Sequence, residues 1–246
     1  GSATRRGQVF RNPKSPIAEA FRSLRTNLEY LASEAQCKTV LVTSNNPGEG
    51  KTFCSINLAT ILAKAGKRVL IVELDLHKPK VQIGLGMTSD VGVSTLLIGR
   101  NTVEECILPS PFENMDVILS GPTPPNASEL ILSKHIESMF AYAREHYDYV
   151  IIDTPPILLI SDALLLMRHV DATMFVVNTK QATKEAIKYA QEVAIGNKLK
   201  NFGFILNGVN KKYSRYYRRY SYNYGYGGYG YGYGYGYGYG SAGKKG

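Results

Sequence analysis

A glycine-rich loop between a short apolar run and a longer helical one is the feature that most constrains how this chain can fold. The run Thr39–Thr43 is typical of a buried strand, residues 51–65 have the pattern of a helix, and Ser44–Thr52 joins them as Ser-Asn-Asn-Pro-Gly-Glu-Gly-Lys-Thr. Backbone N–H groups in such a loop, with the positive end of the helix dipole, form a phosphate site. Asn45 replaces the first glycine of the usual Gly-x-x-x-x-Gly-Lys-Ser/Thr pattern, and a chance glycine-rich turn is the alternative interpretation. Because Gly50, Lys51 and Thr52 stand at the last three positions of that pattern, the loop predicts nucleotide binding.

The remaining apolar runs alternate with helical stretches. Runs nearly continuous in Val, Ile and Leu, separated by helices, are typical of parallel strands buried on both faces. The sequence therefore predicts an α/β fold of the P-loop NTPase type, with a mostly parallel sheet covered by helices on both faces. The predicted helices lie at 16–33, 51–65, 128–146, 161–168 and 183–196. The predicted strands are Thr39–Thr43, Val69–Glu73, Met115–Leu119, Tyr149–Asp153, Ala172–Asn178 and Phe202–Asn207.

Acidic residues end two of these strands. Glu73 and Asp75 are two residues apart, so both leave their strand on the same side, and Asp153 ends another strand. Ligands of doubly wound sheets bind beyond the carboxyl ends of the strands. With the Thr52 hydroxyl, these carboxylates predict a Mg²⁺ site that could also accept a proton from an attacking hydroxyl. A lone acid at a strand end is more often a helix cap, so the prediction depends on the three acids occurring together.

The net charge of +9 lies at the two ends of the chain. Residues 211–246 carry seven Lys or Arg and no acid, residues 1–30 are also basic, and the part between them is close to neutral. A nucleic-acid-binding domain more often has a basic folded face, so no nucleic-acid partner is expected, whereas basic ends suit an anionic membrane or a partner. Three cysteines without a Cys-x-x-Cys pair indicate neither a disulfide framework nor a zinc site. No apolar run is long enough to cross a bilayer.

Three regions are predicted along the chain. Residues 1–14 form a basic linker, in which Gly1 and Ser2 are interpreted as a cloning remnant, and residues 15–212 form the folded domain. Residues 213–246 contain 13 of the 18 tyrosines, mostly alternating with glycine. Such a composition cannot bury a core, so this tail is predicted to be disordered. A flexible stretch of about 25 residues spans roughly 25–30 Å, which would let the tail reach the site of a neighbouring subunit that lies beside it; reach alone does not exclude its own site.

Together these residues resemble the bacterial tyrosine kinase (BY-kinase) family. The loop Ser44–Thr52 matches its Ala/Ser-x-x-Pro-Gly-x-Gly-Lys-Ser/Thr form, Glu73-Leu74-Asp75 resembles its Walker A′ motif, and Val150–Asp153 resembles its Walker B motif. Further matches are Gly121–Asn126 with Glu129-Leu130, the tyrosine cluster, and the Glu-x-x-Arg-x-x-Arg pattern of Glu19, Arg22 and Arg25. The resemblance covers residues 15–240 and implies a P-loop tyrosine kinase domain over residues 15–212.

The resemblance also implies roles for the site residues. The first Walker A′ acid is an Asp in the family, proposed as the base for the incoming tyrosine; here it is Glu73, one methylene longer. His77 stands where an Arg is common, and a loop residue without special duty is the alternative. Asn207 lies where related ATPases place an adenine-contacting Asn, with a strand-end cap as the alternative. The implied catalytic residues are Lys51, Glu73, Asp75 and Asp153, the metal ligands are Thr52, Asp75 and Asp153, and the ATP-binding residues are Pro47, Gly48, Glu49, Gly50, Lys51, Thr52 and Phe53.

The implied activity is ATP-dependent and Mg²⁺-dependent autophosphorylation of the tyrosine tail in trans. Glu19, Arg22 and Arg25 would contact a neighbouring subunit in a ring-like homo-oligomer, and an exposed pair within one helix is the other interpretation. The family works at the cytoplasmic face of the bacterial inner membrane with a transmembrane polysaccharide co-polymerase segment, fused or separate, in exopolysaccharide and capsule synthesis, and has a cognate tyrosine phosphatase. The implied acceptors are Tyr213, Tyr216, Tyr217, Tyr220, Tyr222, Tyr224, Tyr226, Tyr229, Tyr231, Tyr233, Tyr235, Tyr237 and Tyr239.

Two other functions remain open at this point. A non-kinase ATPase switch of the MinD/ParA type shares the predicted sheet and acids, but it carries a signature lysine early in the loop, where this chain has Asn46 and Pro47. A binding module could use the aromatic and cationic tail to contact RNA, although the predicted ATP site would then have no purpose. Phosphate on the tail tyrosines is expected only for the kinase.

Overall fold

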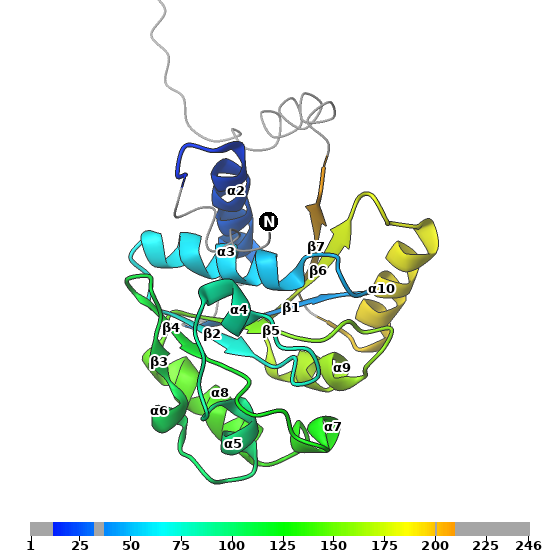
Figure 1. Ribbon diagram of the computed structural model, residues 1–246. Coiled ribbons are helices and arrows are strands. Elements are labelled where there is room, and N and C mark those ends of the chain that lie inside the picture. The colour runs from blue at the N-terminus through cyan, green and yellow to red at the C-terminus, as the bar shows by residue number, and fades with distance from the viewer. Residues whose placement is uncertain (1–11, 32–36, 200, 210–246) are drawn as a thin grey trace, which may run out of the picture. The chain divides into compact units, whose positions relative to one another are not determined.

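A seven-stranded sheet is the centre of the structure. The computed structural model describes residues 12–31, 37–199 and 201–209, and within them the strands follow the order β3-β4-β2-β5-β1-β6-β7 (Figure 1). All neighbouring pairs are parallel except β3 with β4. The strands are β1 (Lys38–Ser44), β2 (Val69–Glu73), β3 (Leu108–Pro109), β4 (Met115–Ile118), β5 (Tyr149–Asp153), β6 (Ala172–Asn178) and β7 (Phe202–Asn207).

The six predicted strands are confirmed with small differences in their ends. β1 is one residue longer at each end than predicted, and β4 ends at Ile118 instead of Leu119. The short strand β3 was not predicted, because two residues are too few to show an alternating pattern. It pairs antiparallel with β4 through Leu108 and Val117 at the edge of the sheet.

The predicted helices also exist, but one of them is divided. The segment 128–146 forms two helices, Ala127–Leu130 and His135–His146, separated by a turn in which Ile131 is buried and Leu132 is 60% exposed. Helices α4 to α6 were missed because each has five residues or fewer. The helices are α2 (Pro16–Leu31), α3 (Lys51–Lys64), α4 (Val81–Leu85), α5 (Val93–Leu97), α6 (Val103–Cys106), α7 (Ala127–Leu130), α8 (His135–His146), α9 (Asp162–Leu166), a 3-10 turn (Met167–His169) and α10 (Lys184–Gly196).

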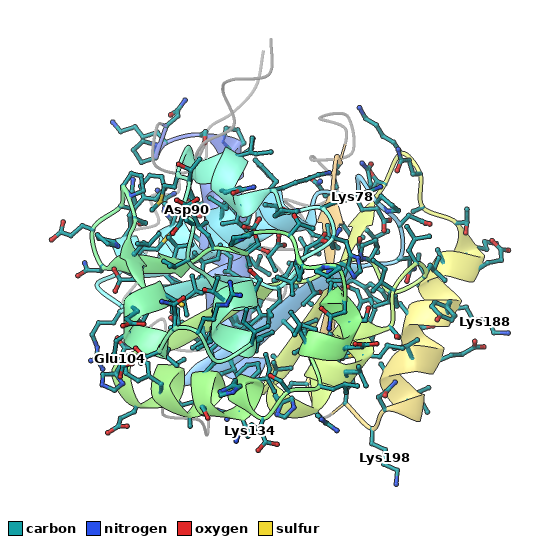
Figure 2. The ribbon with its side chains drawn as sticks, turned by 60° about the horizontal axis from the view of Figure 1, so that its bottom comes forward. Lys78, Asp90, Glu104, Lys134, Lys188 and Lys198 are labelled. Atoms are coloured by element: carbon teal, nitrogen blue, oxygen red, sulfur yellow. The ribbon has the colours of Figure 1, made fainter. Side chains whose placement is uncertain are left out.

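Two apolar cores lie on the two faces of the sheet. Successive side chains of β2 point into opposite cores: Val69 and Ile71 lie in one, and Leu70 and Val72 lie in the other. Helices α2, α3 and α4 cover the first face, and α5 to α10 contribute to the second (Figure 1). Exposed cations such as Lys188 and Lys198 project outward from α10 and the turn after it (Figure 2). The fold predicted from the sequence is therefore confirmed.

The direction of the strands decides where a site can form. All six parallel strands end at one edge of the sheet, and β1 leads there through the loop of residues 45–50 into the start of α3. Glu73 continues the alternation of Val69 and Ile71, and Asp153 continues that of Tyr149 and Ile151, so both acids lie on the face that α3 covers. Among the described residues, no helix has the length and apolar character needed to cross a membrane.

Candidate functional site

The loop between β1 and α3 has the backbone of a phosphate site. Gly48 and Gly50 have φ angles of 82° and 100°, in the left-handed region that favours glycine. A Cβ atom on Gly50 would lie 2.2 Å from Nδ2 of Asn207, so the neighbouring strand end also requires glycine there. Helix α3 starts at Lys51, directly after these glycines, and its first backbone N–H groups face the loop.

Glu49 turns its side chain into the protein instead of toward the loop opening. Its carboxylate is only 3% exposed and accepts hydrogen bonds from the backbone N–H of Asn46 at 2.8 Å and of Asn178 at 3.4 Å. Its backbone carbonyl accepts a hydrogen bond from Nδ2 of Asn207 at 2.8 Å. Glu49 therefore connects the loop to the ends of β6 and β7 by hydrogen bonds, and the Asn207 side chain stabilises the loop through the Glu49 carbonyl. The adenine contact expected of Asn207 stays a prediction.

Asp153 and the first turn of α3 form a buried cluster. Oγ1 of Thr52 donates to Oδ2 of Asp153 at 2.7 Å, and Oγ of Ser55 donates to Oδ1 at 2.9 Å. Burial raises the pKa of Asp153 to about 7, while these two hydrogen bonds and the charge of Lys51 act in the opposite direction. Ser55 was not identified from the sequence; its position one helical turn after Thr52 was the available signal.

Lys51 lies close to two of the predicted acids. Burial lowers the pKa of its ammonium group, and the negative charges of Asp153 and Asp75 oppose that change. The structure thus brings Lys51, Thr52, Asp75 and Asp153 together at one edge of the sheet, as the sequence predicted. Mg²⁺ in phosphate sites is held by one or two carboxylates with phosphate oxygens and water, so this donor set fits a magnesium-bound nucleotide.

Glu73 differs from the other acids of the site. It is fully buried, and its carboxylate accepts hydrogen bonds from the backbone N–H of Val81 at 2.5 Å and of Ser120 at 3.2 Å. Burial raises its pKa, and these backbone hydrogen bonds counteract the rise. In this conformation Glu73 supports the start of α4 and has no free path to a substrate. Its expected role as a base stays a prediction, which requires these contacts to break.

A buried acid that the sequence reasoning missed lies beside His77. Oδ2 of Asp162 is 3.2 Å from Nε2 of His77, and Asp162 is only 1% exposed. Asp162 stands nine residues after Asp153 at the start of α9, outside any motif that sequence reasoning considered. His77 follows Asp75 by two residues, so the sequence placed it in the right loop without a partner.

Other expected residues lie further from this cluster. The ring of Phe53 packs edge-on against Phe21 of α2, with centroids 6.0 Å apart, so its side chain belongs to a helix contact. Nη1 of Arg22 is 2.6 Å from Oε2 of Glu19, an exposed pair within α2, while Nε of Arg25 lies 4.0 Å from Oε1 of Glu29. The intersubunit role of these residues stays a prediction. The acceptor tyrosines and the basic linker lie outside the described residues, apart from Asn12, Pro13 and Lys14.

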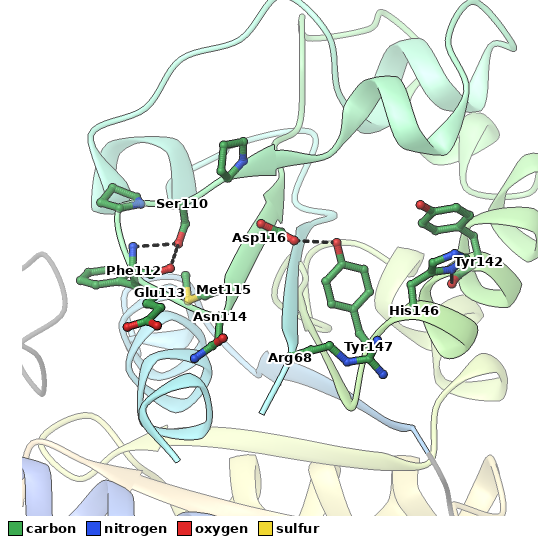
Figure 3. A pocket seen from close by; sticks show the side chains of 12 residues that line it. Arg68, Ser110, Phe112, Glu113, Asn114, Met115, Asp116, Tyr142, His146 and Tyr147 are labelled. Atoms are coloured by element: carbon green, nitrogen blue, oxygen red, sulfur yellow. Dashed lines mark hydrogen bonds between the residues drawn. The ribbon is translucent and has the colours of Figure 1, made fainter. Parts of the chain in front are cut away.

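The opposite edge of the sheet contains a hollow of about 420 Å³ that belongs to a different part of the fold (Figure 3). Its lining includes Arg68 before β2, Asn114 before β4 and Tyr147 before β5, which places it at the amino ends of the strands. The Tyr147 hydroxyl donates to Asp116 at 2.8 Å across it (Figure 3). The predicted residues of the phosphate site do not line this hollow.

Comparison with known sequences gives a family for the chain. A family model described as an AAA domain matches residues 37–193. Tyrosine-protein kinase YwqD of Bacillus subtilis (strain 168) is 37% identical over 217 residues, which cover 88% of this chain and 91% of YwqD. Tyrosine-protein kinase wzc of Salmonella typhimurium is 35% identical over 205 residues, which cover 83% of this chain but only 28% of that protein.

Comparison with solved structures agrees. The kinase domain of the Escherichia coli tyrosine kinase ETK is 30% identical and superposes with a TM-score of 0.79, covering 92% of this chain and 84% of that domain. A MinD protein from Pyrococcus horikoshii, solved with Mg-ADP, has a TM-score of 0.58 over 68% of each chain, but at 22% identity this likeness shows the fold alone. The motifs, the fold and the kinase relatives agree, and the chain belongs to the family of bacterial tyrosine-protein kinases.

Proposed function

We propose that this chain is an ATP-dependent protein-tyrosine kinase that phosphorylates its own C-terminal tyrosines, with one copy acting on the tail of a neighbour. The observation that carries the proposal is the convergence of Lys51 with Asp75 and Asp153 beside a glycine loop with left-handed backbone. Membership of a family whose named relatives are tyrosine-protein kinases supports it. The tail supplies 13 tyrosines for such a reaction.

Each site residue has a separate role in the proposed phosphoryl transfer. The loop N–H groups and Lys51 hold the phosphates, and Thr52, Asp75 and Asp153 would hold Mg²⁺, which neutralises the charge of the transferring group. The tyrosine oxygen bonds to the γ-phosphorus while the bond from that phosphorus to the β–γ bridging oxygen breaks, which releases ADP. The phenolic proton passes to a carboxylate at the end of β2. If Glu73 accepts it, Glu73 must first leave Val81 and Ser120, so the loop after β2 has to move.

Charge on the tail offers a means of regulating assembly. Each added phosphate contributes about −1.5 to −2 at neutral pH, so about four would cancel the seven Lys and Arg of residues 211–246. We propose that phosphorylation weakens a ring-like homo-oligomer in which Glu19 and Arg22 exchange their pairing within α2 for contacts to a neighbour. Fully phosphorylated and dephosphorylated samples are expected to differ in size by light scattering; equal sizes would contradict this regulation.

The cellular setting is also a proposal. The chain spans 28% of wzc, so that relative has a large additional region. By resemblance to the family, we propose that this domain works at the cytoplasmic face of the bacterial inner membrane with a transmembrane polysaccharide co-polymerase segment, in exopolysaccharide and capsule synthesis. A cognate tyrosine phosphatase would remove the phosphates from the tail.

Mass spectrometry of the purified protein incubated with ATP and Mg²⁺ tests the activity. The kinase is expected to show successive additions of phosphate on tail tyrosines, and Lys51→Met is expected to abolish them, a loss of at least about 100-fold, because the ammonium that contacts the phosphates is removed. Lys67→Met, at an exposed lysine near the start of β2, is the matched control and is expected to retain activity. ATP hydrolysis without tail phosphate would favour a MinD-like switch instead.

A further inference from the structure

The loop that joins β2 to α4, residues 74–80, is held in place by two acids, Glu73 at the end of β2 and Asp75 within the loop. Oδ1 of Asp75 accepts a hydrogen bond from the backbone N–H of Lys78 at 3.0 Å, and Glu73 accepts one from Val81 at 2.5 Å. Lys78 lies on this loop and is labelled in Figure 2. The loop therefore begins with a candidate metal ligand, and its conformation decides where the Asp75 carboxylate lies.

A second segment of the site runs beside the phosphate loop. After Asp153, the backbone N–H of Ile157 donates to the carbonyl of Ser44 at 2.9 Å, and that of Leu158 donates to the carbonyl of Asn45 at 3.3 Å. This segment, residues 154–161, then enters α9 at Asp162. Its start and middle are fixed against β1 and the phosphate loop by backbone hydrogen bonds.

The contact between His77 and Asp162 joins these two segments. A carboxylate oxygen accepts hydrogen bonds, so Nε2 of His77 is assigned as the donor in the 3.2 Å contact. The His77 side chain is 34% exposed, whereas that of Asp162 is 1% exposed. Oδ1 of Asp162 is buried and has no hydrogen-bond partner among the described residues. A buried carboxylate with one oxygen unsatisfied lowers stability, so its presence at this place calls for a function.

We propose that His77 and Asp162 are positioning residues of the kinase site, because their contact fixes the β2–α4 loop and so places Asp75 for magnesium. This inference rests on the proposed function and deepens it. In this proposal the pair acts through Asp75, two residues before His77, and not by touching the reacting atoms. Residues that orient a metal ligand typically change activity or metal affinity by about 10–100-fold when they are removed.

The unsatisfied oxygen gives the inference a second consequence. One ring nitrogen of His77 reaches Oδ2 alone, whereas the guanidinium of an arginine presents parallel donors that match both carboxylate oxygens. His77→Arg is therefore expected to preserve the positioning and to satisfy Oδ1 as well. Stability of the nucleotide-free protein reports on this directly, independent of any catalysis.

The experiment compares His77→Ala, Asp162→Ala, the double variant and His77→Arg with the unchanged protein. Three quantities are measured: tail phosphorylation at varied ATP and Mg²⁺, ADP affinity at varied Mg²⁺, and the thermal midpoint without nucleotide. Each alanine variant is expected to lower kcat by about 10-fold or more and to raise the Mg²⁺ concentration for half-maximal rate, with the KM for ATP changed far less. The double variant is expected to be no worse than either single one.

His77→Arg is expected to keep kcat near that of the unchanged protein and to raise the thermal midpoint by about 2–4 °C. His146→Gln, at the end of α8 and far along the chain from this loop, is the matched histidine control and is expected to alter neither kcat nor the Mg²⁺ requirement.

Several results would overturn the inference. They are alanine variants that lower the thermal midpoint but leave kcat and the Mg²⁺ requirement unchanged, losses that add in the double variant, or an arginine variant as impaired as alanine. If the unchanged protein adds no phosphate to its tail, the proposed function fails, and the Mg²⁺ dependence of ADP affinity still decides the inference. An unchanged dependence in His77→Ala would then reject it.

Discussion

The two edges of the sheet differ in how far their charged residues are exposed to solvent. At the carboxyl edge, six charged residues are at most 9% exposed, although Lys78 and Lys80 on the loop after β2 are exposed; the six are Glu49, Lys51, Glu73, Asp75, Asp153 and Asp162. At the amino edge, the Arg68 and Asp148 side chains are 62% and 35% exposed and form a pair 3.4 Å apart. Exposed pairs of this kind contribute little to stability, whereas buried charges are costly unless they are well paired. The contrast indicates that the carboxyl edge retains its charges for binding and reaction.

Shape alone would have pointed to the wrong edge. The hollow of about 420 Å³ in Figure 3 lies at the amino edge, where Tyr147 and Asp116 satisfy each other. Burial and this hydrogen bond raise the pKa of Tyr147, so its hydroxyl stays protonated and serves as a donor. The phosphate site is marked by left-handed glycines and buried charges instead. For this fold, the placement of charge identifies the site better than concavity does.

The largest expected effect on stability comes from the buried acid at the end of β2. Glu73→Ala leaves the N–H groups of Val81 and Ser120 without their acceptor, so the free energy of unfolding is expected to fall by about 2–4 kcal/mol in a urea titration. Glu73→Gln keeps one acceptor oxygen and is expected to lose less. A Glu73→Ala variant as stable as an amino-edge variant would remove the contrast between the two edges.

A smaller, pH-dependent effect is expected at Asp153. Burial raises its pKa from 3.8 to about 7, so the folded protein favours the protonated carboxyl. That contribution to stability is present at low pH and is lost as pH rises through about 7. Asp153→Asn has no such pH-dependent loss. The thermal midpoint of the variant minus that of the unchanged protein, both without nucleotide, is therefore expected to be larger at about pH 8 than at about pH 5. A difference independent of pH would show that Asp153 is ionised throughout.

The smallest effect is expected at the amino edge. Asp148→Asn weakens the exposed pair with Arg68 but keeps an oxygen for the Arg68 backbone N–H, which donates to Asp148 at 2.7 Å. The free energy of unfolding is expected to change by less than about 1 kcal/mol. A larger loss, measured in the same urea titration as the Glu73 variants, would show that the two edges are less different than their exposures indicate.

Much of the site could be predicted from local patterns. Gly-Lys-Thr after an apolar run indicated the phosphate loop, and the ends of two predicted strands placed Glu73, Asp75 and Asp153 at one edge of the sheet. Asp162 escaped notice because no periodic pattern relates it to the loop, whereas Ser55 was missed although it lies one helical turn after Thr52. Helices α4, α5 and α6 were missed because one turn of helix shows no period.

The sequence by itself determined the strand order along the chain, the phosphate loop and the edge of the sheet where the acids meet, because these follow from the spacing of neighbouring residues. Only the tertiary structure decided what each acid does. Glu49 turns inward to the end of β6, Glu73 supports α4, and Asp162 meets a histidine 85 residues away. Such contacts depend on how loops fold back against one another, and residue spacing does not encode that.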